Sequence, residues 1–173
     1  VSLNNKKGAS FFEKKINMSK FEKKINFKIS KNQNFIEYSL LGFNYLKDIS
    51  DIIKKNNGGL LLIDYGYTSK KMKNTLQAVS NHKFANILDN IGNIDITHKI
   101  NFDLYKRFIK QMSGLNSTFT TQRNFLLKLG INQRAEMISK NQNFLRKADI
   151  FYRLKRLIDK KQMGNLFKVM LIK

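Results

Sequence analysis

The chain has 173 residues, of which 42% are hydrophobic; this is enough for one domain with a core and excludes a wholly disordered chain. It has no cysteine, which excludes disulfides, a thiol nucleophile and cysteine-ligated metal centres. The formal net charge is +21, but the lysines are spread along the whole chain. That spread favours a solvated surface over a single nucleic-acid-binding face. No apolar run approaches the roughly 18 residues that span a bilayer, so we expect an intracellular protein.

The first 30 residues predict a tail followed by a hairpin. Residues 1–10 are polar, and we expect a flexible tail there. Residues 12–17 and 21–26 form a near repeat, and the second copy runs into alternating apolar and polar residues up to Ile29. Alternation of this kind predicts a strand with one buried face, so a β-hairpin is expected over residues 11–30.

Residues 39–67 predict a helix followed by a buried strand. Ser39 suits the N-cap of a helix that runs to about residue 56, and Gly58 suits its C-terminal stop. Four apolar residues, 60–63, then lie between turn residues, which is typical of an α/β strand covered on both faces. Asp64 is expected at the carboxyl end of this strand, where open α/β sheets bind their ligands.

The remaining residues, 68–173, predict mainly helices and a terminal strand. Short extended pieces are expected around 76–79, 94–97 and 119–122, and a strand over 166–172. Helical spacing predicts helices over 102–112, 123–129, 132–139 and 144–159. These strands are too few to complete a doubly wound sheet.

Short motifs in a fixed order carry a family resemblance. Taken in that order over roughly residues 11–172, the chain resembles the C-terminal half of the MidA family of class I S-adenosylmethionine (SAM) dependent methyltransferases. That family includes a mitochondrial complex I assembly factor that methylates protein arginine. The matching segments are residues 12–14, 36–39, 58–67, 75–79, 82–84, 95–97, 121–122, 125–127, 130–131, 134–135, 163–164 and 166–169.

The chain departs from the family pattern at the cofactor. The resemblance implies a glycine-rich SAM loop after a first strand, but no Gly-x-Gly-x-Gly motif occurs here, and Gly58-Gly59 precede a strand. The expected fold is therefore α/β: the C-terminal part of a Rossmann-like SAM-methyltransferase sheet, its first half absent. The cofactor-binding residues stay unknown. We expect a fragment, a split gene product or a decayed remnant with weak or no activity alone, and an exposed apolar edge on the 60–63 strand.

The resemblance implies methyl transfer from SAM to a protein arginine nitrogen. Asp64 could orient a guanidinium group bidentately, or serve only as a turn carboxylate. His82 could accept the proton that the substrate loses, or be held by a loop hydrogen bond. Tyr65, Gln77 and Gln122 are expected to contact the substrate, although both glutamines equally suit residues that tie loops. No cluster of His, Asp and Glu has metal-ligand spacing, so no metal is expected.

Two functions follow. The first is a MidA-type methyltransferase in the bacterial cytoplasm or the mitochondrial matrix. Its partners would be a protein substrate such as a complex I subunit and a missing N-terminal half. The second is a non-enzymatic basic module that binds a protein or a nucleic acid. An upstream reading frame with a glycine-rich loop would favour the first; nucleic-acid binding that falls steeply with salt would favour the second.

Overall fold

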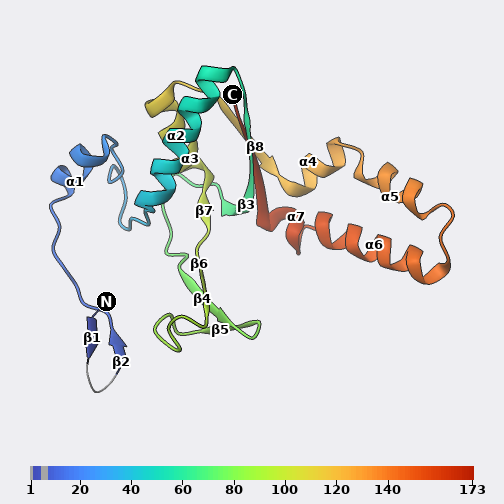
Figure 1. The fold of residues 1–173 in the computed structure, drawn as a ribbon, viewed down its shortest axis with the longest axis horizontal. Coiled ribbons are helices and arrows are strands. Elements are labelled where there is room, and N and C mark those ends of the chain that lie inside the picture. Colours follow the sequence, from blue (N-terminus) through green and yellow to red (C-terminus); the bar gives the residue numbers. More distant parts are fainter. Residues whose placement is uncertain (1, 5–7) are drawn as a thin grey trace. The chain divides into compact units, whose positions relative to one another are not determined.

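The computed structural model describes residues 2–4 and 8–173 (Figure 1). Its internal contacts divide the chain into two compact units. Unit 1 comprises residues 1–38 and 71–99, and unit 2 comprises residues 39–70 and 100–173.

Unit 1 combines short strands with one helix. Its elements are β1 (Ser2–Asn4), β2 (Gly8–Ser10), α1 (Met18–Ile25), β4 (Gln77–Ser80), β5 (Lys83–Ala85) and β6 (Asp95–Thr97). Strands β1 and β2 pair antiparallel, and β4 pairs antiparallel with both β5 and β6. The flexible tail expected over residues 1–10 lies partly outside the described residues.

The hairpin expected over residues 11–30 is wrong, because α1 occupies this segment. The helix begins after Asn17, whose side chain accepts a hydrogen bond from Lys20 N, and it ends at Asn26 in the left-handed conformation. Asparagine is favoured at both kinds of cap, so these caps outweigh the strand-like alternation. The alternation still has a consequence: Phe27 and Ile29 are buried in the loop that follows.

Unit 2 begins with α2 (Leu40–Asn56), and the predicted N-cap is confirmed. The Ser39 hydroxyl accepts a hydrogen bond from Gly42 N at 3.2 Å. At the other end, Asn57 rather than Gly58 takes the left-handed conformation, and Gly58 N donates to Ile53 O. The helix ends at Asn56 as predicted, but the residue that stops it is Asn57 and not Gly58, because asparagine tolerates the left-handed conformation.

A four-stranded sheet follows in the order β7-β3-β9-β8. Strand β9 is antiparallel to both β3 and β8, whereas β7 pairs with β3 in parallel and only at Gly66 and Tyr67. Among the described residues, Leu60 to Tyr65 of β3 therefore have no strand beside them on the β7 side. The strands are β3 (Leu60–Tyr67), β7 (Ile100–Asn101), β8 (Ser117–Thr121) and β9 (Phe167–Ile172).

One face of this sheet is covered by α3 (Phe102–Ser113), which packs on α2. Met170 and Ile172 of β9 are fully buried. Gly66 lets Phe102 of α3 pack directly against the backbone of β3, since an added Cβ would lie 2.3 Å from the Phe102 ring. We call this side the covered face.

The opposite side is the open face. Cross-strand register places Leu61, Ile63 and Tyr65 of β3 there, facing Leu171, Val169 and Phe167 of β9. All three β3 side chains and Leu171 are exposed. The expected strand covered on both faces is therefore wrong for this side, because the described part of the chain leaves these side chains exposed.

A helical arm lies between β8 and β9. It comprises α4 (Gln122–Lys128), α5 (Ile131–Ser139) and α6 (Phe144–Ile158), and the short helix α7 (Met163–Leu166) leads from α6 into β9. Helix α6 packs against α4, α5 and α7. The predicted helices and terminal strand of this region are thus confirmed. No helix in residues 2–4 and 8–173 has the length and apolar content that crossing a membrane requires.

Candidate functional site

Asp64 lies within β3 and not at its end, because the strand continues to Tyr67. Its Oδ1 accepts a hydrogen bond from Tyr65 N at 2.7 Å. Alternation along the strand places Asp64 on the covered face with Gly66, directly opposite Lys168 of β9. The predicted position at the carboxyl end of the strand is therefore wrong by three residues.

Tyr105 of α3 is the second polar group near Asp64. Burial raises the pKa of the Tyr105 phenol above its ordinary value, and the negative charge of Asp64 raises it further. The ring also packs edge-on against Phe43 of α2, with the ring centres 5.1 Å apart. Below its raised pKa the phenol is neutral, so its hydroxyl can donate a hydrogen bond.

Tyr65 points to the other side of the sheet. It stacks on Phe167 of β9 with ring centroids 4.2 Å apart, on the open face. Because neighbouring strand residues face opposite ways, Asp64 and Tyr65 do not line the same face of the sheet. The two residues therefore cannot meet one substrate group from a single face.

Gln122 has a structural partner. Its side chain is buried, and Nε2 donates a hydrogen bond to Leu157 O at 2.9 Å. Next to it, Arg123 Nη1 donates to Ile158 O at 2.7 Å. Both bonds tie α4 to the C-terminal end of α6, which supports the tying role that the sequence left open for Gln122.

Gln77 and His82 belong to unit 1. Gln77 Nε2 donates to Thr97 Oγ1 at 3.1 Å, across the β4–β6 pair. His82 lies in the turn between β4 and β5, where Asn81 and His82 both have positive φ, and its side chain is exposed. The turn geometry accounts for this position without a catalytic role, and the role of His82 stays a prediction.

A groove that the sequence did not predict lies between the open face and α4. Its volume is about 640 Å³. Its lining is mainly apolar and also includes threonine, asparagine and lysine side chains. Alternation of Thr118, Phe119 and Thr120 in β8 was the signal that one side of this sheet is more polar. The groove is lined by Leu61, Thr118, Phe119, Thr120, Asn124, Phe125, Lys128, Leu129, Val169 and Leu171.

The residues of this chain do not by themselves match a SAM cradle. Close backbone approach to a nucleotide needs glycines after a strand. Gly66 is the glycine at the end of β3, and Phe102 and Ile100 O already fill the space beside it. Gly58 and Gly59 precede the strand. No set of three metal-ligating side chains is found among the described residues either.

Comparison with solved structures finds the same fold in a larger protein. A COG1565 superfamily member from Burkholderia thailandensis, solved bound to S-adenosyl-homocysteine, has the same fold with a TM-score of 0.75 at 20% sequence identity. The match covers 99% of this chain and 46% of the solved one. The chain therefore has the α/β fold of part of this larger protein.

The family follows from the sequence comparison. The family Methyltransf_28, described as "Putative S-adenosyl-L-methionine-dependent methyltransferase", matches residues 1–121, and the chain belongs to this family. The resemblance to MidA-type enzymes is thereby confirmed, and SAM is the cofactor that the family description implies.

Curated relatives carry a more specific name. "Protein arginine methyltransferase NDUFAF7, mitochondrial" of Xenopus tropicalis is 24% identical over 124 residues, which are 71% of this chain and 28% of the relative. A Caenorhabditis elegans homologue is 32% identical over 89 residues, covering 51% of this chain and 21% of the relative. The chain thus spans less than a third of the curated relatives it matches.

Proposed function

We propose that this chain is the substrate-side half of a SAM-dependent methyltransferase that modifies arginine in a protein. Membership of the methyltransferase family carries this proposal. The relatives named as protein arginine methyltransferases support arginine as the acceptor. Their names also contain "mitochondrial", which supports the mitochondrial matrix over a bacterial cytoplasm. A complex I subunit stays the proposed protein substrate.

We further propose that a second polypeptide segment supplies the cofactor-binding half. The β3 edge from Leu60 to Tyr65 has no strand beside it among the described residues, although α/β sheets bury such strands. The short parallel pairing with β7 at Gly66 and Tyr67 leaves room for another parallel strand along the rest of that edge. Helices of that segment would cover the open face of β3, because helices cover both faces of α/β sheets.

Within this arrangement the chain's own residues bind and orient the acceptor. A carboxylate holds a guanidinium group through two parallel hydrogen bonds, and Asp64 is proposed for that role, with the neutral Tyr105 phenol beside it. Positioning is the main contribution that a protein makes to a displacement of this kind. His82 is retained as a proposed proton acceptor, and Tyr65 and Gln77 as proposed substrate contacts.

A calorimetric titration with SAM tests whether cofactor binding requires the second polypeptide segment. The chain alone is expected not to bind SAM at micromolar concentration. A mixture with a polypeptide that carries a glycine-rich loop, encoded directly upstream, is expected to bind. Micromolar binding by the chain alone would contradict the proposed division, and absence of binding by the mixture would contradict the proposed cofactor half.

Arginine methylation by the binding-competent mixture tests the role of Asp64. The Asp64→Asn variant is expected to lower kcat/KM for an arginine peptide by about tenfold or more, because the charge-assisted pair is lost. The matched control is Asp149→Asn, which removes a carboxylate from the helical arm. Equal effects of the two substitutions would remove Asp64 from the proposed site.

A further inference from the structure

The end of the helical arm exposes large apolar side chains. We call residues 137–148, around the turn between α5 and α6, the arm tip; Figure 1 shows this turn at the end of the arm away from β9. Phe144 and Leu145, the first two residues of α6, are 82% and 77% exposed. Met137 on α5 is exposed as well. These two side chains are therefore hardly packed against the rest of unit 2 and contribute little to its stability.

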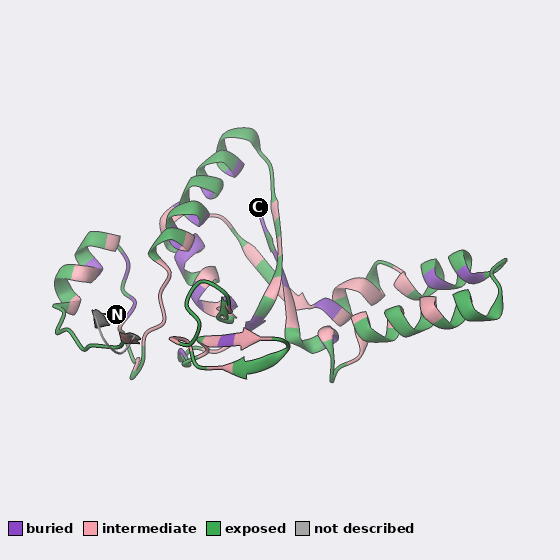
Figure 2. Ribbon diagram, turned by 60° about the horizontal axis from the view of Figure 1, so that its bottom comes forward, coloured by how far each residue is buried: buried purple, intermediate pink, exposed green. Residues whose placement is uncertain are grey.

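The exposure extends along one side of α6. Ile150, Leu154 and Leu157 are half-buried and share one side of α6, which packs against α4 and α5, whereas no residue of α6 is fully buried. Phe151 and Tyr152 lie about two turns after Phe144 and Leu145, respectively, and are exposed as well. Figure 2 shows most of α6 in the colour of exposed residues. Helix α6 therefore carries a second apolar stripe that nothing in unit 2 covers.

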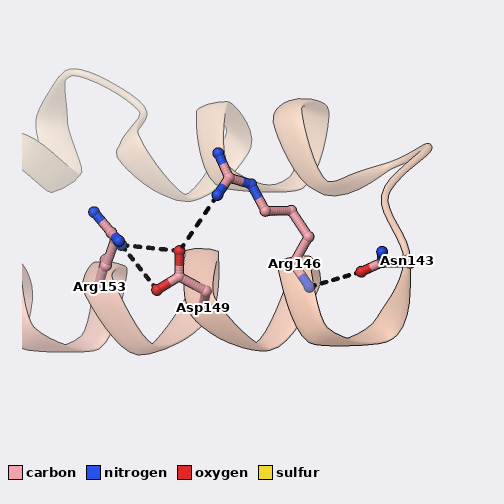
Figure 3. Close-up of polar contacts among 4 residues, drawn as sticks. All are labelled: Asn143, Arg146, Asp149 and Arg153. Carbon is pink, nitrogen blue, oxygen red and sulfur yellow. Dashed lines mark hydrogen bonds and ion pairs between the residues drawn. The ribbon is translucent and has the colours of Figure 1, made fainter.

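Positive charge surrounds the apolar pair. Residues 137–148 contain Lys140, Arg146 and Lys147 but no Asp or Glu. No ion pair is found for Lys140 or Lys147 within the described part of the chain. The nearest acid along the helix is Asp149, and Figure 3 shows it between two arginines: Arg153 Nε donates to both of its oxygens at 2.9 and 3.0 Å, and Arg146 lies 3.9 Å away.

We propose that the arm tip binds an anionic membrane surface. Phe144 and Leu145 would enter the boundary between headgroups and acyl chains, while Lys140 and Lys147 contact lipid phosphates. Exposed Phe and Leu beside basic residues are the combination that interfacial helices use. This binding would be peripheral, at the surface of the membrane, and would need no spanning helix.

Charge favours an anionic membrane over a second copy of the chain as the partner of the arm tip. Two copies would each bring a net charge of +21, so their arm tips would repel. A partner helix normally binds in a groove. The groove of unit 2 lies beside α4, and none of the residues that line it belongs to the arm tip. A protruding pair of side chains at a helix turn instead suits a flat, deformable surface.

Vesicle co-sedimentation of the full chain tests the proposal. The wild type is expected to bind vesicles of phosphatidylcholine mixed with phosphatidylglycerol, and not phosphatidylcholine alone. Because the chain is strongly basic overall, the decisive variant keeps the charge: Phe144→Ser/Leu145→Ser should lower the partition coefficient by about tenfold or more. The matched control, Phe84→Ser/Ile96→Ser, removes two exposed apolar residues from unit 1 and should leave binding unchanged.

The cationic contacts have their own test. Lys140→Ala/Lys147→Ala should lower binding by roughly fivefold for each lysine at low salt. Lys54→Ala/Lys55→Ala, in the exposed last turn of α2, removes the same charge elsewhere and should have the smaller effect. Equal losses would show that overall charge, and not the arm tip, drives binding, and would overturn the proposal.

Insertion can be observed directly because the chain has no cysteine. An environment-sensitive dye on Leu145→Cys should shift to shorter emission wavelength with anionic vesicles, whereas the same dye on Phe84→Cys should not. No shift at Leu145→Cys would overturn the proposal. The proposal would also be overturned if the chain bound neither kind of vesicle but bound an acidic helical peptide at the arm tip.

Discussion

Glu22 is a buried carboxylate whose partners all lie within a short segment of unit 1. Its Oε1 accepts hydrogen bonds from Ser30 N and Ser30 Oγ, both at 2.8 Å, and Lys28 Nζ lies 3.2 Å from Oε2. The backbone and hydroxyl donors of Ser30, and then Lys28, lower the pKa of Glu22 to about 2 against the opposing effect of burial. Because the Lys28 side chain is exposed, its ion pair contributes less than the Ser30 bonds.

This pKa makes unit 1 sensitive to acid. In the unfolded chain Glu22 titrates near 4.5, so its contribution to stability is complete above that pH and is lost as the pH falls towards 2. Thermal unfolding of Glu22→Gln should therefore show a lower Tm than the wild type at neutral pH, with the two values converging near pH 2. The exposed Glu13→Gln is the control and should change little. A Tm difference that stays constant down to pH 2 would contradict this account.

Gly66 is required by packing. An added Cβ would meet the Phe102 ring at 2.3 Å and Ile100 O at 2.6 Å, so Gly66→Ala should destabilise unit 2 by about 1–3 kcal/mol or more. Denaturant unfolding measures this loss. At Gly58 an added Cβ meets nothing within 4 Å, and Gly58→Ala serves as the control with an expected change of less than about 1 kcal/mol. Similar values for both substitutions would rule out the close contact as the cause.

Tyr105 reports on Asp64. Removal of the negative charge in Asp64→Asn should lower the pKa of the Tyr105 phenol, while burial still keeps that pKa above its ordinary value. The measurement is an alkaline titration of labelled tyrosine rings by NMR. Asp51→Asn, on the exposed side of α2, should leave the Tyr105 resonance unchanged. An unchanged Tyr105 pKa in Asp64→Asn would separate the two residues.

At the scale of elements, two side chains hold the helical arm together at its base. Gln122 and Arg123 donate to the carbonyls of Leu157 and Ile158, which joins the start of α4 to the end of α6. The last carbonyls of a helix have no hydrogen-bond partner within the helix, and these two side chains supply the missing donors. The two bonds therefore hold the start of α4 beside the end of α6.

Loss of this tie should be measurable. Gln122→Ala leaves the Leu157 carbonyl without its donor in a buried setting, which should cost about 1–3 kcal/mol in the free energy of unfolding. Amide hydrogen exchange in α6 should also become faster. Gln133→Ala on the exposed side of α5 is the control. Unchanged exchange in α6 would show that apolar packing alone holds the arm.

At the scale of the whole molecule, the open face of β3 decides whether the chain works alone. Leu61→Lys/Ile63→Lys places charge on exposed positions, so the fold should persist while binding of the proposed cofactor half is lost. Sedimentation of the mixture measures the association. Leu41→Lys/Ile52→Lys adds the same charge to exposed positions of α2 and should leave association intact. Retained association in the β3 variant would exclude this face as the interface.

Local signals predicted several elements correctly, and the reasons are visible in particular residues. Ser39 caps α2 as expected, and the 3.6-residue spacing of Phe102, Phe108 and Ile109 places them in the core. The α1 segment was predicted wrongly because Asn17 and Asn26, its two caps, are local features that compete with alternation. The roles of Asp64, Tyr65, Gln77 and His82 remain predictions, since no geometry within a single unit joins them into one site.

The sequence by itself determined the family, most of the helices, the absence of thiol chemistry and the lack of a glycine-rich loop, because each depends on residue identity or short-range spacing. Only the tertiary structure decided that Asp64 lies inside a strand, that Asp64 and Tyr65 face opposite sides, and that Gln122 ties α4 to α6. It also revealed the open side of β3 and the bare arm tip. These features depend on which surfaces meet after folding. An apolar residue that packs inside and one left exposed look identical along the chain.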